Sequence, residues 1–480
     1  MINKYPKYLF FIILISVTLK IFYFEYLSTI TVDDLTYIKL TNNLFENFYY
    51  SLNNIDPHTF YPPLYPIILG LEKKILSDWY YVYFFNNILL TTITSYILCL
   101  IVYEFFENYF DKFVYPLFFL YPIFITGRSI INVSSEIIVN FILIISYYYI
   151  LKSFKNKKIK YLILPNILLS SSYLIRPECI LFFISLIIYQ IIFISNLKRK
   201  IIITLFSLIN GIIFILSYIY YLYLILGTIT LSEKSSVVSE IGNNLSQSSF
   251  LLKINNLFSI LFLTPNLINP FLLLGLIIFI LKIFNLKKNI LFKHNYFIIY
   301  FPTFCFLLIL TFKYALIGRV IYQIIPFLLI LSCIGFGYFI KIHKSLLNTF
   351  TLVFFIFSIF LIINLEIYNN HSVLYKKMYN YVEENFEETD YNCILSRDAK
   401  AEYYLPASKI IIFDINNYQN NLCVPKFIFV SNLTHIALRP ITKLETSFFN
   451  KEVITINENQ YNKHSTINRD KYFVDLYIKN

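Results

Sequence analysis

Residues 8–40 read YLFFIILISVTLKIFYFEYLSTITVDDLTYIKL, a long apolar run that ends shortly before an acidic pair. The run is as long as the roughly 20 residues that a helix needs to cross a membrane. No small-residue cleavage site follows it, and further apolar runs come later, so residues 8–27 predict a retained transmembrane helix rather than a secretion signal. Asp33 and Asp34 then fall where that helix should leave the membrane.

The composition of the whole chain indicates a polytopic membrane protein. Of its 480 residues, 58% are hydrophobic and only 14% are charged, and the mean hydropathy of +0.63 is well above that of a water-soluble domain. We predict about eleven transmembrane helices, each of roughly 20 residues. After the first, they cover residues 79–103, 113–127, 130–151, 161–175, 178–195, 201–226, 256–284, 296–317, 320–340 and 347–365. The apolar part of residues 61–76 is too short to cross and should lie along the interface or enter only partly.

The positive charges of the chain indicate its orientation in the membrane. The net charge of +12 does not indicate a nucleic-acid partner, because the lysines gather in short loops between apolar runs, as they do in cytoplasmic loops. With the N-terminus in the cytoplasm, the basic segments at 152–160, 198–200, 286–293 and 341–344 all fall inside. The same count places outside residues 28–61, 128–136, 176–178, 227–255, 318–319 and everything after about 366. We therefore expect a multi-pass protein of the cytoplasmic (inner) membrane with an extracytoplasmic C-terminus.

The C-terminal tail differs in character from the rest of the chain. Its short apolar runs CILSR, KIIIFDI and KFIFVS predict buried strands, and YKKMYNYVEENFEE has helical spacing. We expect two domains: a transmembrane domain over 1–366 with the external loop 28–61, and a small extracytoplasmic α/β domain over 367–480. Cys393 and Cys423 share this tail, and whether they form a disulfide stays open.

Charged residues of both signs map to the predicted outer side. A charge at the centre of a membrane helix costs about 2.5–3.5 kcal/mol on insertion scales, so charges kept beside apolar runs suggest a function. The group comprises Asp33, Asp34, Arg128, Glu136, Arg176, Glu178 and Arg319. Each alone can be a helix-end residue that reaches water. Together they favour a site for transfer from a lipid-carried phosphate, where a carboxylate accepts a proton and arginines hold the leaving phosphate.

Five stretches, in order, resemble the GT-C superfamily of integral-membrane glycosyltransferases. They are DDLTYIKLTNNLFE (33–46), YPPLYPIILG (61–70), SSEIIVNFILIISYYYILKS (134–153), LLSSSYLIRPECILFF (168–183) and GRVIYQIIPFLLIL (318–331). The chain looks most like the branch that groups protein mannosyltransferases with lipid A aminoarabinose transferases, the glycosyltransferase family 39-like branch. The resemblance extends over residues 8–345 and implies a GT-C-like helical fold.

The resemblance also implies roles for several outer-side residues. Asp33 matches the catalytic base, with Asp34 as its neighbour, and Glu136 matches an acidic position at the outer end of a span. Arg176 and Arg319 match positions near the donor site, where arginine suits bidentate phosphate binding. The alternatives are structural: the acidic residues can cap helices and the arginines can anchor at the interface.

One family position departs from its usual residue. The family often places Lys or His before its external Pro-Pro motif to help hold the phosphate, whereas this chain has Tyr61 there and His58 nearby. Both are therefore candidate contacts for substrate phosphate, although Pro62 and Pro63 can also serve only to fix the entry to a helix. Arg128 and His58 are the next candidates should the two arginines be anchors.

The implied function is that of an inverting glycosyltransferase. It would move a sugar from a polyprenyl-phosphate carrier to a lipid, glycan or protein acceptor on the outer face. No cofactor is implied. The sequence contains no metal-ligand spacing, so it leaves the question of a divalent metal open. The alternatives are a polysaccharide or lipid transporter and an envelope polymer ligase or polymerase. A transporter would more typically carry midplane ionisable residues and broken helices in related halves.

Overall fold

The structure is a computed structural model. It describes residues 14, 17–18, 20–21, 32–52, 54–105, 135–156, 158–233, 275–281, 299, 301–305, 323–342, 370–387, 393–396, 401–405, 409–411, 424–432, 443–456, 459–469 and 472–479. The chain divides into two compact units, each described here by itself. The first unit comprises Met1–Phe24 and Tyr37–Ile362, and the second comprises Glu25–Thr36 and Ile363–Asn480. The division falls within one helix, α2.

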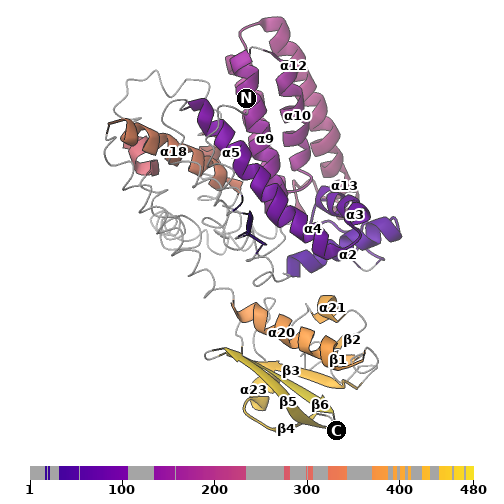
Figure 1. Cartoon of the computed structure of the whole chain (residues 1–480). Coiled ribbons are helices and arrows are strands. Elements are labelled where there is room, and N and C mark those ends of the chain that lie inside the picture. Colours follow the sequence, from indigo (N-terminus) through magenta and orange to yellow (C-terminus); the bar gives the residue numbers. More distant parts are fainter. Residues whose placement is uncertain are drawn as a thin grey trace, which may run out of the picture. The chain divides into compact units, whose positions relative to one another are not determined.

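The regular elements described in the first unit are helices, joined by turns and by a loop that carries an isolated β-bridge between Ser51 and Pro57 (Figure 1). Its elements are α2 (Val32–Glu46), α3 (Leu64–Leu76), α4 (Trp79–Phe84), the π-helix η2 (Phe85–Leu90), α5 (Thr91–Phe105), α9 (Ser135–Asn156), α10 (Lys160–Ser172), the 3₁₀ turn η3 (Pro177–Cys179), α11 (Ile180–Phe193), α12 (Leu197–Gly211), the π-helix η4 (Ile212–Leu216), α13 (Ser217–Leu226) and α18 (Ile325–Ile342). Within the described ranges, three continuous helical segments are long and apolar enough to cross a membrane: Trp79–Val102, Ser135–Asn156 and Leu197–Leu226.

Some predicted spans are shorter helices than the sequence suggested. The apolar runs at 161–175 and 178–195 form α10, of 13 residues, and α11, of 14 residues. A 13-residue helix extends about 20 Å, less than the roughly 30 Å of the hydrocarbon core. Pro177 explains the break, because the residue before a proline is disfavoured in helical geometry. Other predicted spans, among them 113–127 and 347–365, lie outside the described residues, so the count of about eleven stays a prediction.

A buried polar triad joins three helices of this unit. Asn166 of α10, Gln190 of α11 and Ser207 of α12 are each 0% exposed. Gln190 Nε2 donates to Asn166 Oδ1 at 3.1 Å, and Ser207 Oγ donates to Gln190 Oε1 at 2.8 Å. The Ser207 hydroxyl also lies within hydrogen-bond distance of Asn166 Oδ1 and of the Ile203 carbonyl, so its single proton is shared among these acceptors. The triad thus links α10, α11 and α12.

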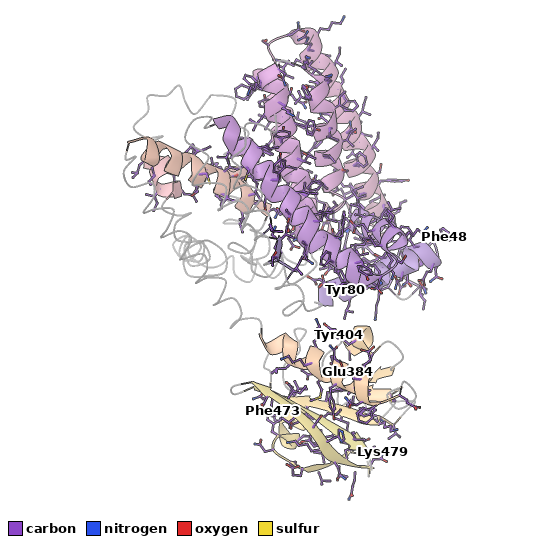
Figure 2. All side chains as sticks on the ribbon, in the orientation of Figure 1. Phe48, Tyr80, Glu384, Tyr404, Phe473 and Lys479 are labelled. Atoms are coloured by element: carbon purple, nitrogen blue, oxygen red, sulfur yellow. The ribbon has the colours of Figure 1, made fainter. Side chains whose placement is uncertain are left out.

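The predicted external loop 28–61 contains a helix that we did not expect. The sequence suggested only a polar segment with helix-capping residues, whereas Val32–Glu46 forms α2. Its packing on α3 accounts for this difference. Thr41 Oγ1 donates to the Pro66 carbonyl at 3.2 Å, and Gly70 lies so close to Phe45 that a Cβ there would stand 2.0 Å from the ring. Phe48, just past the end of α2, is 89% exposed and points away from the helices (Figure 2).

The second unit contains a six-stranded sheet. Its strands are β1 (Cys393–Leu395), β2 (Lys409–Ile411), β3 (Phe427–Ser431), β4 (Val453–Ile456), β5 (Asn459–Arg469) and β6 (Tyr472–Lys479), in the order β2-β1-β3-β6-β5-β4. The first three pair in parallel, and the pairs β3–β6, β6–β5 and β5–β4 are antiparallel. The helices within the described part of this unit are α20 (Asn370–Asn385), α21 (Ala401–Tyr404) and α23 (Lys443–Phe448).

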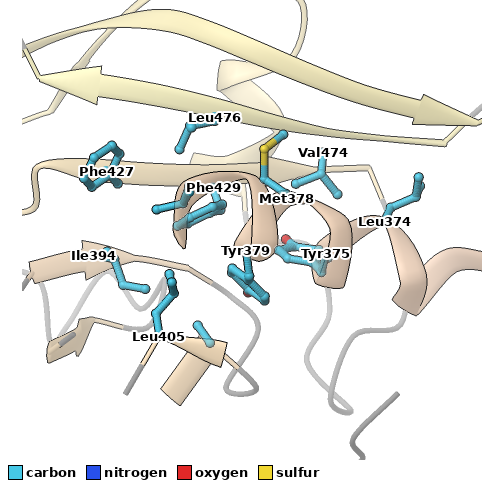
Figure 3. Packing of buried hydrophobic residues seen from close by; sticks show 12 residues of the cluster. Leu374, Tyr375, Met378, Tyr379, Ile394, Leu405, Phe427, Phe429, Val474 and Leu476 are labelled. Atoms are coloured by element: carbon cyan, nitrogen blue, oxygen red, sulfur yellow. The ribbon is translucent and has the colours of Figure 1, made fainter. Parts of the chain in front are cut away.

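Both faces of this sheet bury apolar side chains. Phe427 and Phe429 of β3 pack with Tyr379 and Met378 of α20 on one face (Figure 3). Alternate residues of the same strand join a second core on the other face, which includes Phe448 of α23. A strand covered on both faces reads as a continuous apolar run, which is why β1 and β3 could be predicted. The apolar run KIIIFDI likewise predicted β2. The small C-terminal α/β fold is thus confirmed, whereas β4, β5 and β6 were missed.

Two features considered for the tail, the disulfide and the domain boundary, involve residues outside the described ranges. Cys393 is disulfide-bonded. Cys423, whose pairing with Cys393 the sequence left open, lies outside the described residues. The expected domain boundary at 366/367 also falls outside them and stays a prediction.

Candidate functional site

Arg176 lies at the break between α10 and α11. Its extended backbone, with φ −144° and ψ 118°, ends one helix and begins the turn at Pro177. The backbone N–H of Arg176 donates to the Ser172 carbonyl at 2.9 Å, which holds the break in place. The residue is only 5% exposed. A guanidinium this deeply buried requires charged or hydrogen-bonding partners.

Two carboxylates surround the Arg176 guanidinium. Glu136, in the first turn of α9 and 4% exposed, pairs through Oε1 with Arg176 Nη1. Glu178 Oε2 lies 3.7 Å from Arg176 Nε. Burial pushes the pKa of Arg176 down, but the two carboxylates more than offset this effect and the pKa is raised. The three side chains together carry a net negative charge.

Tyr37 of α2 connects this charge cluster to an aromatic group. It is 5% exposed, and its hydroxyl shares a hydrogen bond with the Ser135 side chain at the start of α9. Its ring centroid lies 4.8 Å from that of Tyr61 and 4.6 Å from that of Tyr65. Burial raises the pKa of Tyr37 well above its usual value, which Arg176 counteracts only in part. The hydroxyl therefore stays protonated and can donate a hydrogen bond.

Asp33 and Asp34 lie in the first turn of α2, one helical turn before Tyr37. Negative side chains in this turn interact favourably with the helix dipole. Asp34 is 2% exposed, and Asp33 is half-buried. Residues three and four apart share a helix face. Asp33 is four residues before Tyr37, and Asp34 is three residues before it, so both carboxylates lie on the side of α2 that carries Tyr37.

His58 also contacts Tyr61. The Tyr61 backbone N–H donates to His58 Nε2 at 3.1 Å, so this nitrogen carries no proton. Burial lowers the pKa of His58 to about 4, against a small opposing effect of Glu233. The neutral ring stacks on Tyr61 with centroids 5.7 Å apart. His58 and Glu233 also line a cavity of about 270 Å³.

The structure places six of the eight expected site residues. It brings Glu136 and Arg176 together directly, and it places Tyr61 next to His58. Asp33 and Asp34 are placed within α2. Arg128 and Arg319 lie outside the described residues. Over the described ranges, no group of three or more His, Cys, Asp or Glu side chains could hold a metal ion.

Three residues of this region were not predicted from the sequence: Tyr37, Ser135 and Glu233. The helical spacing of Tyr37 from Asp33, four residues on, was a usable signal for the first of them. Ser135 directly precedes Glu136, but serine is common at helix starts, so its residue type gave no distinct signal. Glu233 lies in a long predicted loop, where nothing in the sequence distinguishes it.

Comparison with known proteins identifies the fold. No protein-family model matches the sequence, and curated protein sequences give no match either. The crystal structure of ArnT from Cupriavidus metallidurans bound to undecaprenyl phosphate aligns with a TM-score of 0.60 and 8% sequence identity. The alignment covers 98% of each chain. The chain thus has a GT-C-like fold, as expected, and together with its apolar helices this fold indicates an integral membrane protein.

Proposed function

We propose that the protein is an inverting glycosyltransferase of the GT-C type, which uses a polyprenyl-phosphate sugar as donor. The observation that carries the proposal is the buried Arg176 with Glu136, Glu178 and Tyr37, in a chain that folds like ArnT. The solved ArnT structure is bound to undecaprenyl phosphate, a polyprenyl phosphate. A buried arginine beside a protonated tyrosine offers the donors that a phosphate group needs.

The reaction is a single displacement at the sugar carbon. An acceptor oxygen forms a bond to the anomeric carbon as the bond from that carbon to the carrier phosphate breaks, and the electron pair leaves with the phosphate. One direct displacement inverts the configuration. We assign proton removal from the acceptor to Asp33, with Asp34 beside it, because a carboxylate at this helix end can act as a general base.

The charges of the cluster limit what Arg176 can do alone. The two negative charges of Glu136 and Glu178 exceed the single positive charge of Arg176, so Arg176 by itself would hold a phosphate weakly. A guanidinium has five N–H donors and can bridge a carboxylate and a phosphate oxygen. We assign the further positive charge to Arg319, with Arg128 as the next candidate. Tyr37 adds a neutral donor.

The acceptor can be a lipid, a glycan or a protein on the outer face. The basic loops that the sequence places inside support this orientation. The disulfide bond of Cys393 supports it too, because disulfides persist in oxidising compartments.

Sugar transfer by the purified full-length chain tests the proposal. In lipid nanodiscs with a polyprenyl-phosphate sugar and membrane extracts as acceptor, the wild type should release free carrier phosphate and form a glycosylated product. Asp33→Asn should lower turnover by about 10²–10⁴-fold, the range for loss of a general base. Glu46→Gln, an exposed carboxylate at the far end of α2, is the matched control. Normal turnover in Asp33→Asn, or no transfer from any polyprenyl donor, would overturn the proposal.

A further inference from the structure

A cavity of about 270 Å³ lies beside His58, and none of its lining residues belongs to the Arg176 cluster. It is lined by Leu52, Asp56, Pro57, His58, Thr59, Phe60 and Glu233. This His58 pocket is formed entirely by the first unit. Its volume is below the range of about 300–1,000 Å³ usual for sites that take drug-sized ligands. The pocket therefore suits a group the size of a single sugar ring and is too small for a polyprenyl chain.

Hydrogen bonds from three tyrosines hold the walls of the His58 pocket. Tyr218 donates its hydroxyl to the Thr59 carbonyl at 3.2 Å, and Tyr221 donates to the His58 carbonyl at 3.1 Å. Tyr173 donates to the carbonyl of Leu231, two residues before Glu233. Thr59 Oγ1 in turn donates to Glu233 Oε2. Helices α10 and α13 thus fix both segments that form the pocket.

The residues that line the pocket disfavour an anionic ligand. Asp56 and Glu233 contribute two carboxylates, which only accept hydrogen bonds when ionised. His58 supplies no positive charge, because the Tyr61 N–H occupies Nε2 as an acceptor. A phosphate would face like charges in this pocket, so the sequence-based candidacy of His58 for phosphate binding fits the structure poorly. A ligand rich in hydroxyl donors suits these acceptors, and the Phe60 ring gives it an apolar surface.

We infer that the His58 pocket binds a hydroxyl-rich saccharide group that carries no negative charge, and that this group belongs to the acceptor. The assignment to the acceptor rests on the proposed function. A donor sugar is bonded directly to its phosphate and must stay beside the Arg176 cluster. His58 of the pocket is linked to Tyr37 through two successive ring contacts, Tyr37 with Tyr61 and Tyr61 with His58. The pocket shares no lining residue with the Arg176 cluster.

Binding of simple glycosides to the full-length chain in nanodiscs tests this inference without requiring turnover. The probes are the methyl glycosides of glucose, glucosamine and glucuronic acid, which share one ring and differ in charge. Saturation-transfer NMR titrations measure their relative affinities. We expect the neutral glucoside and the cationic glucosaminide to bind, and the anionic glucuronide to bind at least about tenfold more weakly. A preference for the glucosaminide over the glucoside would assign the site to an amino sugar.

Two variants locate the binding in the pocket. Glu233→Gln and Asp56→Asn each replace a charged acceptor by a neutral one, which should weaken glucoside binding about tenfold. In the same variants, the ratio between the affinities for the glucoside and the glucuronide should be smaller than in the wild type. Glu46→Gln removes an exposed carboxylate that does not line the pocket and should leave all three affinities unchanged.

The outcomes separate this inference from the proposed function. Equal binding of all three glycosides by the wild type, or no binding of any, would overturn the inference even if the pocket variants fail to fold. Sugar transfer without glycoside binding would overturn only the inference that the pocket binds a saccharide and would leave the proposed function standing. Selective glycoside binding without transfer from any polyprenyl donor would keep the saccharide pocket and overturn the transferase role.

Discussion

At the scale of single residues, Arg176 and Glu136 form an ion pair that is almost removed from water. Removal of charges from water is unfavourable, and their mutual attraction compensates only while both partners are present. Loss of one partner leaves an uncompensated buried charge, whereas loss of both can be nearly neutral. The pair is therefore a sensitive point of the structure whether or not it contacts a substrate.

A double-mutant cycle should reveal this coupling. Arg176→Met alone should destabilise the protein by about 3–5 kcal/mol, because Glu136 is then buried without its partner. Adding Glu136→Leu should recover a large part of that loss, giving a coupling energy of the order of 2 kcal/mol. Denaturant unfolding of the four proteins in detergent provides the free energies. Additive effects of the two substitutions would show that the pair is not coupled.

His58 gives a second prediction at this scale, on the dependence of stability on pH. The pKa of its imidazole is about 4 in the folded protein, against 6.5 ordinarily. Between these values the unfolded chain binds a proton that the folded chain does not, so stability should fall as the pH drops from 6.5 to 4. Above pH 6.5 this contribution should be constant.

Melting temperatures at pH 7 and pH 4.5 measure the effect. His58→Gln keeps an acceptor for the Tyr61 N–H but does not titrate, so it should lose less stability than the wild type over the same range. Equal losses in the two proteins would show that His58 titrates normally.

The sequence revealed the charged residues of the site better than the uncharged ones. Glu136 and Arg176 were identifiable because a charge next to an apolar run needs a reason. Tyr37 was harder to recognise: its spacing from Asp33 was a signal, but the chain contains 43 tyrosines, so the residue type alone distinguishes none of them. That Glu136 contacts Arg176 depends on the packing of α9 against α10, which no local pattern encodes.

At the scale of elements, the sequence predicts those that are apolar throughout. The segment Trp79–Val102 and the strand β3 were expected because membrane spans and doubly covered strands both need continuous apolar runs. Strand β5, Asn459–Arg469, is mostly polar and was missed because its register depends on pairing with β6. Helix α2 was missed for a similar reason, since its buried face depends on α3.

The polar triad of α10, α11 and α12 leads to a prediction about helix packing. Ser207→Ala removes a hydroxyl that bonds across helices, to Gln190, and should destabilise the protein by about 0.6–1.7 kcal/mol. Ser185→Ala is the matched control, because the Ser185 hydroxyl bonds the Leu181 carbonyl of its own helix at 2.7 Å. Unfolding free energies in detergent should differ between the two variants by most of that amount. Equal effects would show that the triad does not stabilise the packing.

At the scale of the whole molecule, the positive charges and the disulfide lead to the same topology. An odd number of spans, such as the expected eleven or so, places the two termini on opposite sides of the membrane. The lysine clusters predict an N-terminus inside, and we therefore expect the C-terminal sheet outside. The disulfide bond of Cys393 is compatible with that side, because cytoplasmic thiols are kept reduced.

Reporter fusions test this topology independently of any activity. Alkaline phosphatase, which is active only outside the cytoplasm, should be active when fused after residue 228 or residue 480. A fluorescent protein that folds only inside should be bright when fused after residue 156 or residue 344. Thiol labelling should find Cys393 oxidised in the cell and reactive only after reduction. A bright fusion at residue 480 with reduced Cys393 would mean an even number of spans between the termini. At least one basic cluster or one proposed site residue would then lie on the opposite side of the membrane from the side predicted for it. The assignment of Asp33 to the outer face, across the membrane from the lysine clusters, would no longer be supported.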